Sequence, residues 1–242
     1  MFANYSSILD LKGFDTSKVT IMSGMFAGVS TPTIDLSSFD TRNVEYMVRM
    51  FEKNSSTEVI GLENFKTPKL ISVTLMFAGA KMKKIDLSSF DTKNVKIFSS
   101  MFTAAEATEI IGYENFNTSS ATTFGGMFRQ TKIKSIDVSK YNTSNVTSMG
   151  HMFDGSEATS IIGLNNFNTS KVTDMKQMFA NSKAISLDLS SFVINSDTDI
   201  TNMFSNSSAT TGYVKDTTIA SKFNDSSVTA KPDSLTFTVK SS

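Results

Sequence analysis

Residues 135–153 read SIDVSKYNTSNVTSMGHMF, and closely similar stretches recur along the chain. Each copy ends in Met-Phe, and the intervals between successive phenylalanines alternate between 25 and 26 residues. The eight copies end at Phe26, Phe51, Phe77, Phe102, Phe128, Phe153, Phe179 and Phe204. A fixed period of this size is typical of stacked repeat proteins. We therefore expect one elongated domain whose length scales with the number of copies.

Each copy opens with two apolar residues that are separated by one other residue. The first of them is Leu9, Ile34, Ile60, Ile85, Ile111, Ile136, Ile162 or Leu187. The second is Leu11, Leu36, Leu62, Leu87, Tyr113, Val138, Leu164 or Leu189. Mostly branched apolar residues two positions apart predict a short strand, with both side chains pointing inward.

An aromatic residue follows each predicted strand and leads into a turn. These rings, which we expect to stack as one column, are Phe14, Phe39, Phe65, Phe90, Phe116, Tyr141, Phe167 and Phe192. Asp or Asn comes next in most copies and predicts an Asx turn. A threonine then recurs at Thr16, Thr41, Thr67, Thr92, Thr118, Thr143 and Thr169. Stacked hydroxyl groups at this position are expected to bond between neighbouring coils.

The end of each copy has helical spacing. Met47, Met50 and Phe51 lie at positions i, i+3 and i+4, which places them on one face of a short helical turn. Methionine suits a narrow gap between coils because its side chain is unbranched and adaptable.

The alternation of the period coincides with a change inside the strand. The extra residue is expected before the strands that carry Gly61, Gly112 and Gly163, where glycine between apolar residues predicts a bulge. The remaining copies have aspartate there, at Asp10, Asp35, Asp86, Asp137 and Asp188. From Asp35 onward the aspartates then stand about 10 Å apart, because adjacent strands are about 4.8 Å apart.

The pattern stops after Phe204. We expect a solenoid over residues 1–204 and a small βαβ-like cap over residues 205–242, built from a strand at Tyr213–Lys215, a helix at Thr217–Phe223 and an edge strand at Leu235–Lys240. An open ladder edge invites association. No cap is predicted before the first coil, which contains Ile8, Leu9 and Leu11, so we expect fraying or end-to-end self-association there.

Composition excludes several classes of protein. Lys+Arg and Asp+Glu number 23 each, so no basic excess points to nucleic acid. The cluster of Lys81, Lys83 and Lys84 is interpreted as a solvated turn. There is no cysteine for a disulfide or a thiolate site, and no apolar run of 18 residues predicts membrane insertion. The first residues lack the features of a signal peptide.

No catalytic constellation is apparent, and we expect no enzyme, no cofactor and no metal site. His151, the one histidine, occupies a column that varies between copies, so we interpret it as a surface variant of a helix position. Aspartates in alternate coils cannot converge on one Ca²⁺ ion, which needs 6–8 oxygen ligands. The acids also follow the period, whereas the paired carboxylates of a glycoside hydrolase must face one another.

The copy that contains IDLSSFDTKNV and ends in Met-Phe resembles the BspA-like family of bacterial surface repeats, in its version with a unit of roughly 25 residues. The resemblance covers about residues 2–204, and the tail also looks like the end cap of such arrays. It implies a right-handed, leucine-rich-repeat-like solenoid. It further implies a fragment of a secreted or wall-attached bacterial protein, since some relatives are adhesins that bind host proteins.

Two classes of function remain open. The first is a binding module whose strand side contacts a host extracellular-matrix, mucus or other surface protein or glycan. Its expected contact residues are Asp86, Ser88, Glu114, Asp137 and Ser139. The second is a structural spacer that projects another domain from the cell wall. Ice binding, suggested by the periodic threonines, is disfavoured by the charges between them. We favour the binding module, because a spacer would keep a uniform surface.

Overall fold

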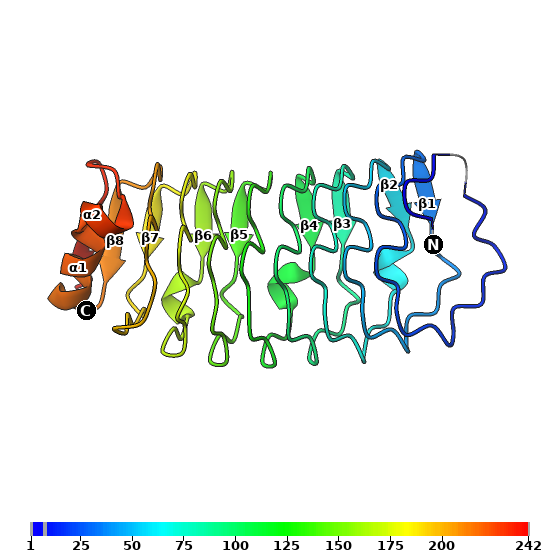
Figure 1. Ribbon diagram of the computed structural model, residues 1–242, viewed down its shortest axis with the longest axis horizontal. Coiled ribbons are helices and arrows are strands. Elements are labelled where there is room, and N and C mark those ends of the chain that lie inside the picture. Colours follow the sequence, from blue (N-terminus) through cyan, green and yellow to red (C-terminus); the bar gives the residue numbers. More distant parts are fainter. Residues whose placement is uncertain (1, 7–8, 242) are drawn as a thin grey trace.

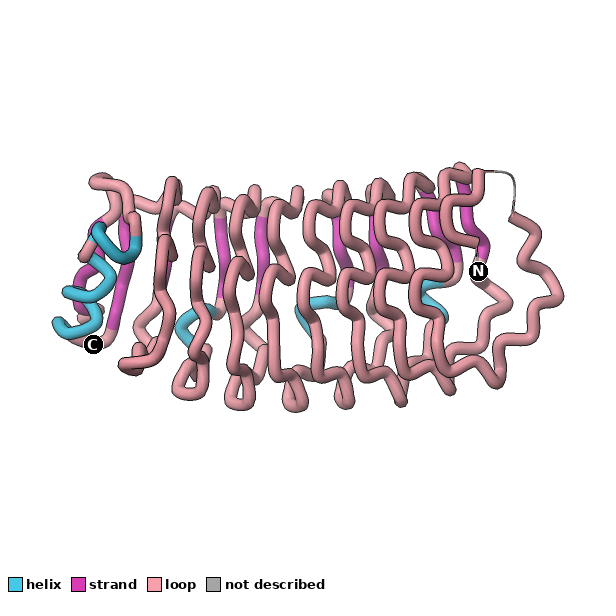
Figure 2. The backbone as a smooth tube through the Cα atoms, in the orientation of Figure 1, coloured by secondary structure: helices cyan, strands magenta, loops and turns pink. Residues whose placement is uncertain are grey.

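The chain forms an elongated solenoid in a computed structural model that describes residues 2–6 and 9–241. Successive coils lie side by side along the long axis, with two helices at the C-terminal end (Figure 1). Most of each coil is loop and turn, and short strands recur on one side of the molecule (Figure 2). The predicted repeat solenoid is confirmed. Ile8, which we placed in the first coil, lies outside the described residues.

The strands are short, parallel and grouped. They are β1 (Thr33–Asp35), β2 (Glu58–Ile60), β3 (Lys84–Asp86), β4 (Glu109–Ile111), β5 (Ser135–Asp137), β6 (Ser160–Ile162), β7 (Ser186–Asp188), β8 (Thr211–Val214) and β9 (Thr236–Val239). Within the described chain they pair as β1–β2, β3–β4, β5–β6 and β7–β8–β9. The ladder is therefore interrupted between β2 and β3, between β4 and β5, and between β6 and β7.

The register corrects one predicted column. Ile34 of β1 pairs with Val59 of β2, and Asp35 pairs with Ile60. The inward residue of β2 is thus Val59, whereas Ile60 points outward. The same shift applies to Ile111 and Ile162.

The reason for the shift is that the extra residue follows the strand instead of preceding it. Gly61, Gly112 and Gly163 have φ angles of 93°, 90° and 93°. A β-carbon on Gly61 would lie 2.6 Å from the Ser37 nitrogen of the neighbouring coil, so both the backbone angle and the close approach require glycine. Each glycine leads into a 3₁₀ turn: η1 (Leu62–Asn64), η2 (Tyr113–Asn115) or η3 (Leu164–Asn166).

The predicted helical turn at the end of each copy is wrong. Residues 22–28 and their equivalents form successive β-turns, which we name the staircase. Met50 N donates to Met47 O within its own coil, whereas Phe51 N donates to Met76 O of the next coil. Left-handed residues recur at two positions per coil, for example at Arg49 and Lys53. Consecutive turns present every third or fourth side chain to one side, as a helix does, so spacing alone could not distinguish them.

The core contains an unbroken column of rings, but a different one from that predicted. The Met-Phe phenylalanines stack with centroids 5.3–6.0 Å apart from Phe26 to Phe204. In the expected column, Phe65 stacks on Phe90 and Phe167 on Phe192. Each of these two pairs joins the ring of a glycine coil to the ring of the following aspartate coil. Phe116 and Tyr141 pack instead against Phe98 and Phe124, which replace methionine in their coils.

The predicted threonine contacts are confirmed. The hydroxyl of Thr118 donates to Asn142 O at 3.1 Å and accepts from Asn142 N at 2.7 Å. The same two bonds join Thr16 to Asp40, Thr41 to Lys66, Thr67 to Asp91, Thr143 to Asn168 and Thr169 to Val193. We name this column the threonine clasp. All of these threonines are buried, so each hydroxyl satisfies two backbone groups of the next coil at a position partly shielded from water.

The C-terminal segment closes the core. It runs β8, α1 (Thr217–Asn224), α2 (Ser226–Thr229) and β9, and β9 pairs in parallel with β8 at the edge of the sheet. Phe223 and Phe237 pack against Phe204 with centroids 5.3 and 4.7 Å away, which ends the phenylalanine stack. The Asn224 side chain exchanges two hydrogen bonds with the backbone of Phe237. The expected βαβ arrangement is therefore observed.

Candidate functional site: the strand face

The outward side chains of the strands form one long surface, which we name the strand face. The residues at one register position of the ladder form a row on this face, which we name the inner row. In the order of the coils, its members are Asp35, Ile60, Asp86, Ile111, Asp137, Ile162, Asp188 and Tyr213. Acidic and apolar side chains thus alternate along the row. The row follows from the register, because every glycine coil places a large apolar residue where its neighbour has aspartate.

Three of the four apolar members of this row are exposed, and Ile111 is half-buried. Ile60 is 39% exposed, Ile162 48% and Tyr213 36%. Apolar residues fall in every second coil of the row, so its successive apolar members, with Ile111 between Ile60 and Ile162, are about 10 Å apart along the solenoid. The sequence-based prediction placed Ile60 and Ile162 in the core. The glycine after each strand was the available signal, since a bulge there moves the outward position by one residue.

The predicted contact residues lie in three successive coils of this face, and their carboxylates also hold the ends of strands. Asp86 Oδ1 accepts a hydrogen bond from Ser88 N at 3.0 Å, and Asp137 Oδ1 accepts one from Ser139 N at 2.9 Å. In the glycine coil between them, Glu114 Oε2 accepts from Gly112 N at 3.0 Å. Hydrogen bonding with Ser88, through its side chain and its backbone amide, lowers the pKa of Asp86. The contact role of these five residues remains a prediction.

A hollow of about 480 Å³ opens on the strand face at the first interruption of the ladder. Its walls include Val59, Ile60 and Leu62 from one coil and Lys84 and Asp86 from the next. Glu58 and Lys84 are charged side chains at its rim. The volume falls within the range of small-molecule sites in proteins.

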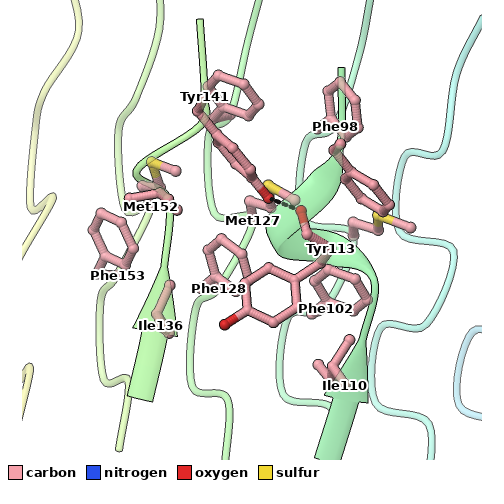
Figure 3. Packing of buried hydrophobic residues seen from close by; sticks show 14 of the residues in the cluster. Phe98, Phe102, Ile110, Tyr113, Met127, Phe128, Ile136, Tyr141, Met152 and Phe153 are labelled. Atoms are coloured by element: carbon pink, nitrogen blue, oxygen red, sulfur yellow. Dashed lines mark hydrogen bonds between the residues drawn. The ribbon is translucent and has the colours of Figure 1, made fainter. Parts of the chain in front are cut away.

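The second interruption is filled by a tyrosine. Tyr113 occupies the position of Leu62, and its hydroxyl accepts a hydrogen bond from Asp137 N at 3.1 Å and donates to Ser135 O at 3.4 Å. The ring packs edge to face on Phe128, 5.4 Å away. Tyr141 donates its hydroxyl to Tyr113 O at 3.0 Å (Figure 3). Burial raises the pKa of both phenols, so both stay protonated and can donate.

A band of alternating charge runs beside the strands. Lys81, Glu106, Lys132, Glu157 and Lys183 occupy one position in five successive coils. Glu157 receives hydrogen bonds from Lys132 at 2.7 Å and from Lys134 at 2.6 Å, and they lower its pKa to about 2. Lys83 pairs with Glu106, and Lys84 with Glu109. Two lysines of the predicted solvated turn are therefore members of ion pairs between coils.

His151 has a carboxylate partner that the sequence did not reveal. It lies in a left-handed turn of the staircase and not in a helix. Its Nδ1 is 3.2 Å from Asp154 Oδ2, which also accepts from Arg129 Nε at 2.9 Å. Asn181 Nδ2 donates to the other oxygen at 3.1 Å. Asp154 is 4% exposed, so these bonds compensate a buried charge, and its oxygens are already occupied.

The described residues contain neither a cluster suited to a metal ion nor a membrane-spanning helix. Over residues 2–6 and 9–241, no cluster of three or more His, Cys, Asp or Glu residues has the arrangement of a metal site. Within the same residues, no helix is long and apolar enough to cross a membrane.

Comparison with known protein families gives one finding. The model of the family described as "Mycoplasma protein of unknown function, DUF285" matches residues 1–112 and again residues 106–217. The two matches divide the chain into halves that each contain several coils, as expected for a repeat. The comparison with curated proteins and the comparison with solved structures gave no match.

Proposed function

Because the chain belongs to this family of Mycoplasma proteins of unknown function, and its fold presents one long amphipathic face, we propose that it is a non-enzymatic binding module. The proposal includes the BspA-like character that the sequence suggests. The strand face is the contact surface, and the partner is a host extracellular-matrix, mucus or other surface protein or glycan. The chain acts outside the cell, as part of a bacterial surface protein.

The observation that carries the proposal is the exposed inner row of the strand face. A spacer does not require Ile60 and Ile162 in contact with water, whereas a binding module can use apolar side chains that recur in one row. Alternating aspartate and isoleucine instead offer a partner an apolar and an acidic contact about every 10 Å. Repeated weak contacts of this kind add up when one extended partner engages several of them.

The test is a binding experiment with variants of the inner row. The full chain and the double variant Ile60→Asp/Ile162→Asp are applied to immobilised matrix proteins, mucins and glycans. We expect the chain to bind at least one component, and the double variant to bind it at least tenfold more weakly.

A matched control uses the opposite side of the molecule. Ile21 is 60% exposed and begins the ladder of single bridges, where it pairs with Tyr46, away from the strands. Ile21→Asp should bind as the unchanged chain does. Equal loss in both variants would show non-specific hydrophobic adhesion and overturn the proposal.

The charge of the row is tested without disturbing the strand ends. Asp86→Asn and Asp137→Asn keep an oxygen that can accept from Ser88 N and Ser139 N, whereas lysine at these positions would remove those bonds. Reduced binding by the double asparagine variant, with an unchanged melting temperature, would support an acidic contact. Unchanged binding would assign the contact to the apolar members alone.

The spacer remains the second candidate, and the core favours it. The continuous phenylalanine stack and the threonine clasp join every coil to the next, as a stiff rod requires. If the chain binds no component of the panel, yet restores display of a neighbouring domain when it is reinserted into its parent protein, the spacer is correct.

A further inference from the structure

The three interruptions of the strand ladder leave backbone groups that a strand would normally pair. In β3, Leu87 N donates to Ile111 O and Glu109 N donates to Lys83 O, so residues 83, 85 and 87 face β4. Backbone groups of alternate residues point to opposite sides of a strand. Lys84 O and Asp86 N therefore face β2, and no hydrogen bond among the described residues joins β2 to β3.

The next interruption shows what can satisfy these groups. Ser135 O and Asp137 N occupy the positions of Lys84 O and Asp86 N, because the two coils share the same register. Both are bonded to the Tyr113 hydroxyl, at 3.4 and 3.1 Å. A phenol is thus the group that this repeat itself places between two unpaired strands.

The first interruption has the same backbone but no phenol. Leu62 stands where Tyr113 stands in the later copy, and leucine carries no group that could reach Lys84 O or Asp86 N. The hollow of about 480 Å³ lies here, between apolar walls formed by Val59, Ile60 and Leu62. An apolar wall beside a donor and an acceptor matches a ring with a hydroxyl group.

The charged groups at the rim favour a neutral ligand. Lys84 pairs with Glu109 at 3.7 Å, and Lys83 pairs with Glu106 at 3.4 Å, so both lysines of the rim are engaged by carboxylates of the next coil. The paired lysines offer no concentrated positive patch for a phosphate, and Glu58, Glu63 and Asp86 belong to no metal-binding cluster among the described residues. We propose that the hollow between β2 and β3 binds a p-hydroxyphenyl group, the side chain of a tyrosine on a polypeptide partner, with its hydroxyl between Lys84 O and Asp86 N.

This inference deepens the proposed function and rests on it, since it names the side chain that the strand face takes from a protein partner. Its test needs no macromolecular partner. ¹⁵N-labelled chain is titrated with N-acetyl-L-tyrosine amide and, separately, with N-acetyl-L-phenylalanine amide. We expect the amide resonances of Val59 and Asp86 to shift with the tyrosine amide, and the phenylalanine amide to bind about fivefold more weakly, because it lacks the hydroxyl.

Two reciprocal variants locate the site. Leu62→Tyr places a phenol in the hollow, so the tyrosine amide should no longer shift Asp86. Tyr113→Leu empties the second interruption, so the same ligand should newly shift Asp137. If Leu62→Tyr fails to fold, the comparison of the two ligands on the unchanged chain still decides the question.

Equal affinity for both amides, or no shift at Asp86 up to the solubility limit of the tyrosine amide, overturns the inference. Binding of the tyrosine amide together with failure of the panel experiment would retain the site and reject adhesion to the tested components. Binding to the panel that Leu62→Tyr leaves unchanged would retain adhesion and reject the hollow as its site.

Discussion

The two long sides of the solenoid are joined in different ways. On the staircase side every coil is bonded to the next, through four backbone bonds such as those from Met47, Arg49, Phe51 and Lys53. On the strand face the ladder bonds run within groups of two or, at the C-terminal end, three strands and stop between these groups. The continuous side is nearly uniform in its buried residues, whereas the interrupted side carries alternating aspartate, isoleucine and glycine. Regular bonding on one side therefore allows variation on the other.

The largest effect is expected where the continuous side is broken. Phe102 is fully buried and stacks on Phe77 and Phe128. Phe102→Ala should lower the free energy of unfolding by about 3–5 kcal/mol, the usual cost of deleting a buried ring. Urea denaturation measures it. Phe90→Ala is the matched variant, and it should cost less because Phe90 is only half-buried; an equal cost would contradict the comparison.

The threonine clasp comes next. Thr118→Val keeps the shape of the side chain but leaves Asn142 N and Asn142 O without their buried partner. We expect a loss of about 2–3 kcal/mol, since an unpaired buried polar group costs about 1–3 kcal/mol. Thr108→Val, at an exposed position beside the strands, should change stability by less than about 0.5 kcal/mol. Equal effects in the two variants would show that the clasp contributes little.

A smaller effect is expected at the bridged interruption. Tyr113→Phe removes only the hydroxyl that joins Ser135 O to Asp137 N. The free energy of unfolding should fall by about 1–2 kcal/mol, because the two backbone groups lie near the surface and water can replace part of the loss. Hydrogen exchange at Asp137 should accelerate more than at Asp86, which has no such bond; similar changes at both would count against a local bridge.

How much of this the sequence predicts depends on the kind of pattern. The period located every Met-Phe coil, and the threonine column foretold bonds that the structure shows. The period could not distinguish a helix from consecutive turns, because the spacing of Met47, Met50 and Phe51 is compatible with both. Nor could it decide whether the extra residue precedes or follows the strand, so Ile60 and Ile162 were placed inside. Two further contacts could not be predicted from the spacing of residues, because they depend on the directions of side chains. They are the contact of His151 with Asp154 and the hydrogen bonds of the Tyr113 hydroxyl to Ser135 O and Asp137 N.

Relief of backbone strain in the staircase should raise the free energy of unfolding, whereas the variants above should lower it. Ala104 is exposed and has a φ angle of 53°, which costs a residue with a β-carbon about 1–2 kcal/mol. Ala104→Gly should raise the free energy of unfolding by up to about 1 kcal/mol, after the entropy that glycine loses on folding. Ala220→Gly, inside α1, should lower it by a similar amount. Thermal denaturation of both variants shows whether the signs differ.

The smallest effect is expected on the loss of stability at acidic pH. The pKa of Glu157 is lowered to about 2 by Lys132 and Lys134. A carboxyl group with a lowered pKa adds stability above its ordinary value of 4.5, and this contribution is lost as the pH falls toward 2. Glu157→Gln should therefore narrow the stability difference between pH 7 and pH 2 slightly, since exposed pairs contribute little. If the stability difference between pH 7 and pH 2 were larger in Glu157→Gln than in the unchanged chain, the lowered pKa of Glu157 would be contradicted.

The glycine bulge has a consequence for how such proteins change in length. A coil with Gly61 fits on a coil with Asp35, and its neighbour on the far side again carries aspartate at position 86. Deleting a single coil from the alternating part of the chain would set two bulges, or two aspartates, directly against each other, and of these only adjacent aspartates occur here, at Asp10 and Asp35. Gene rearrangements that preserve the fold should thus add or remove one 25-residue coil together with one 26-residue coil. Chains of this family are expected to differ in size by such double steps.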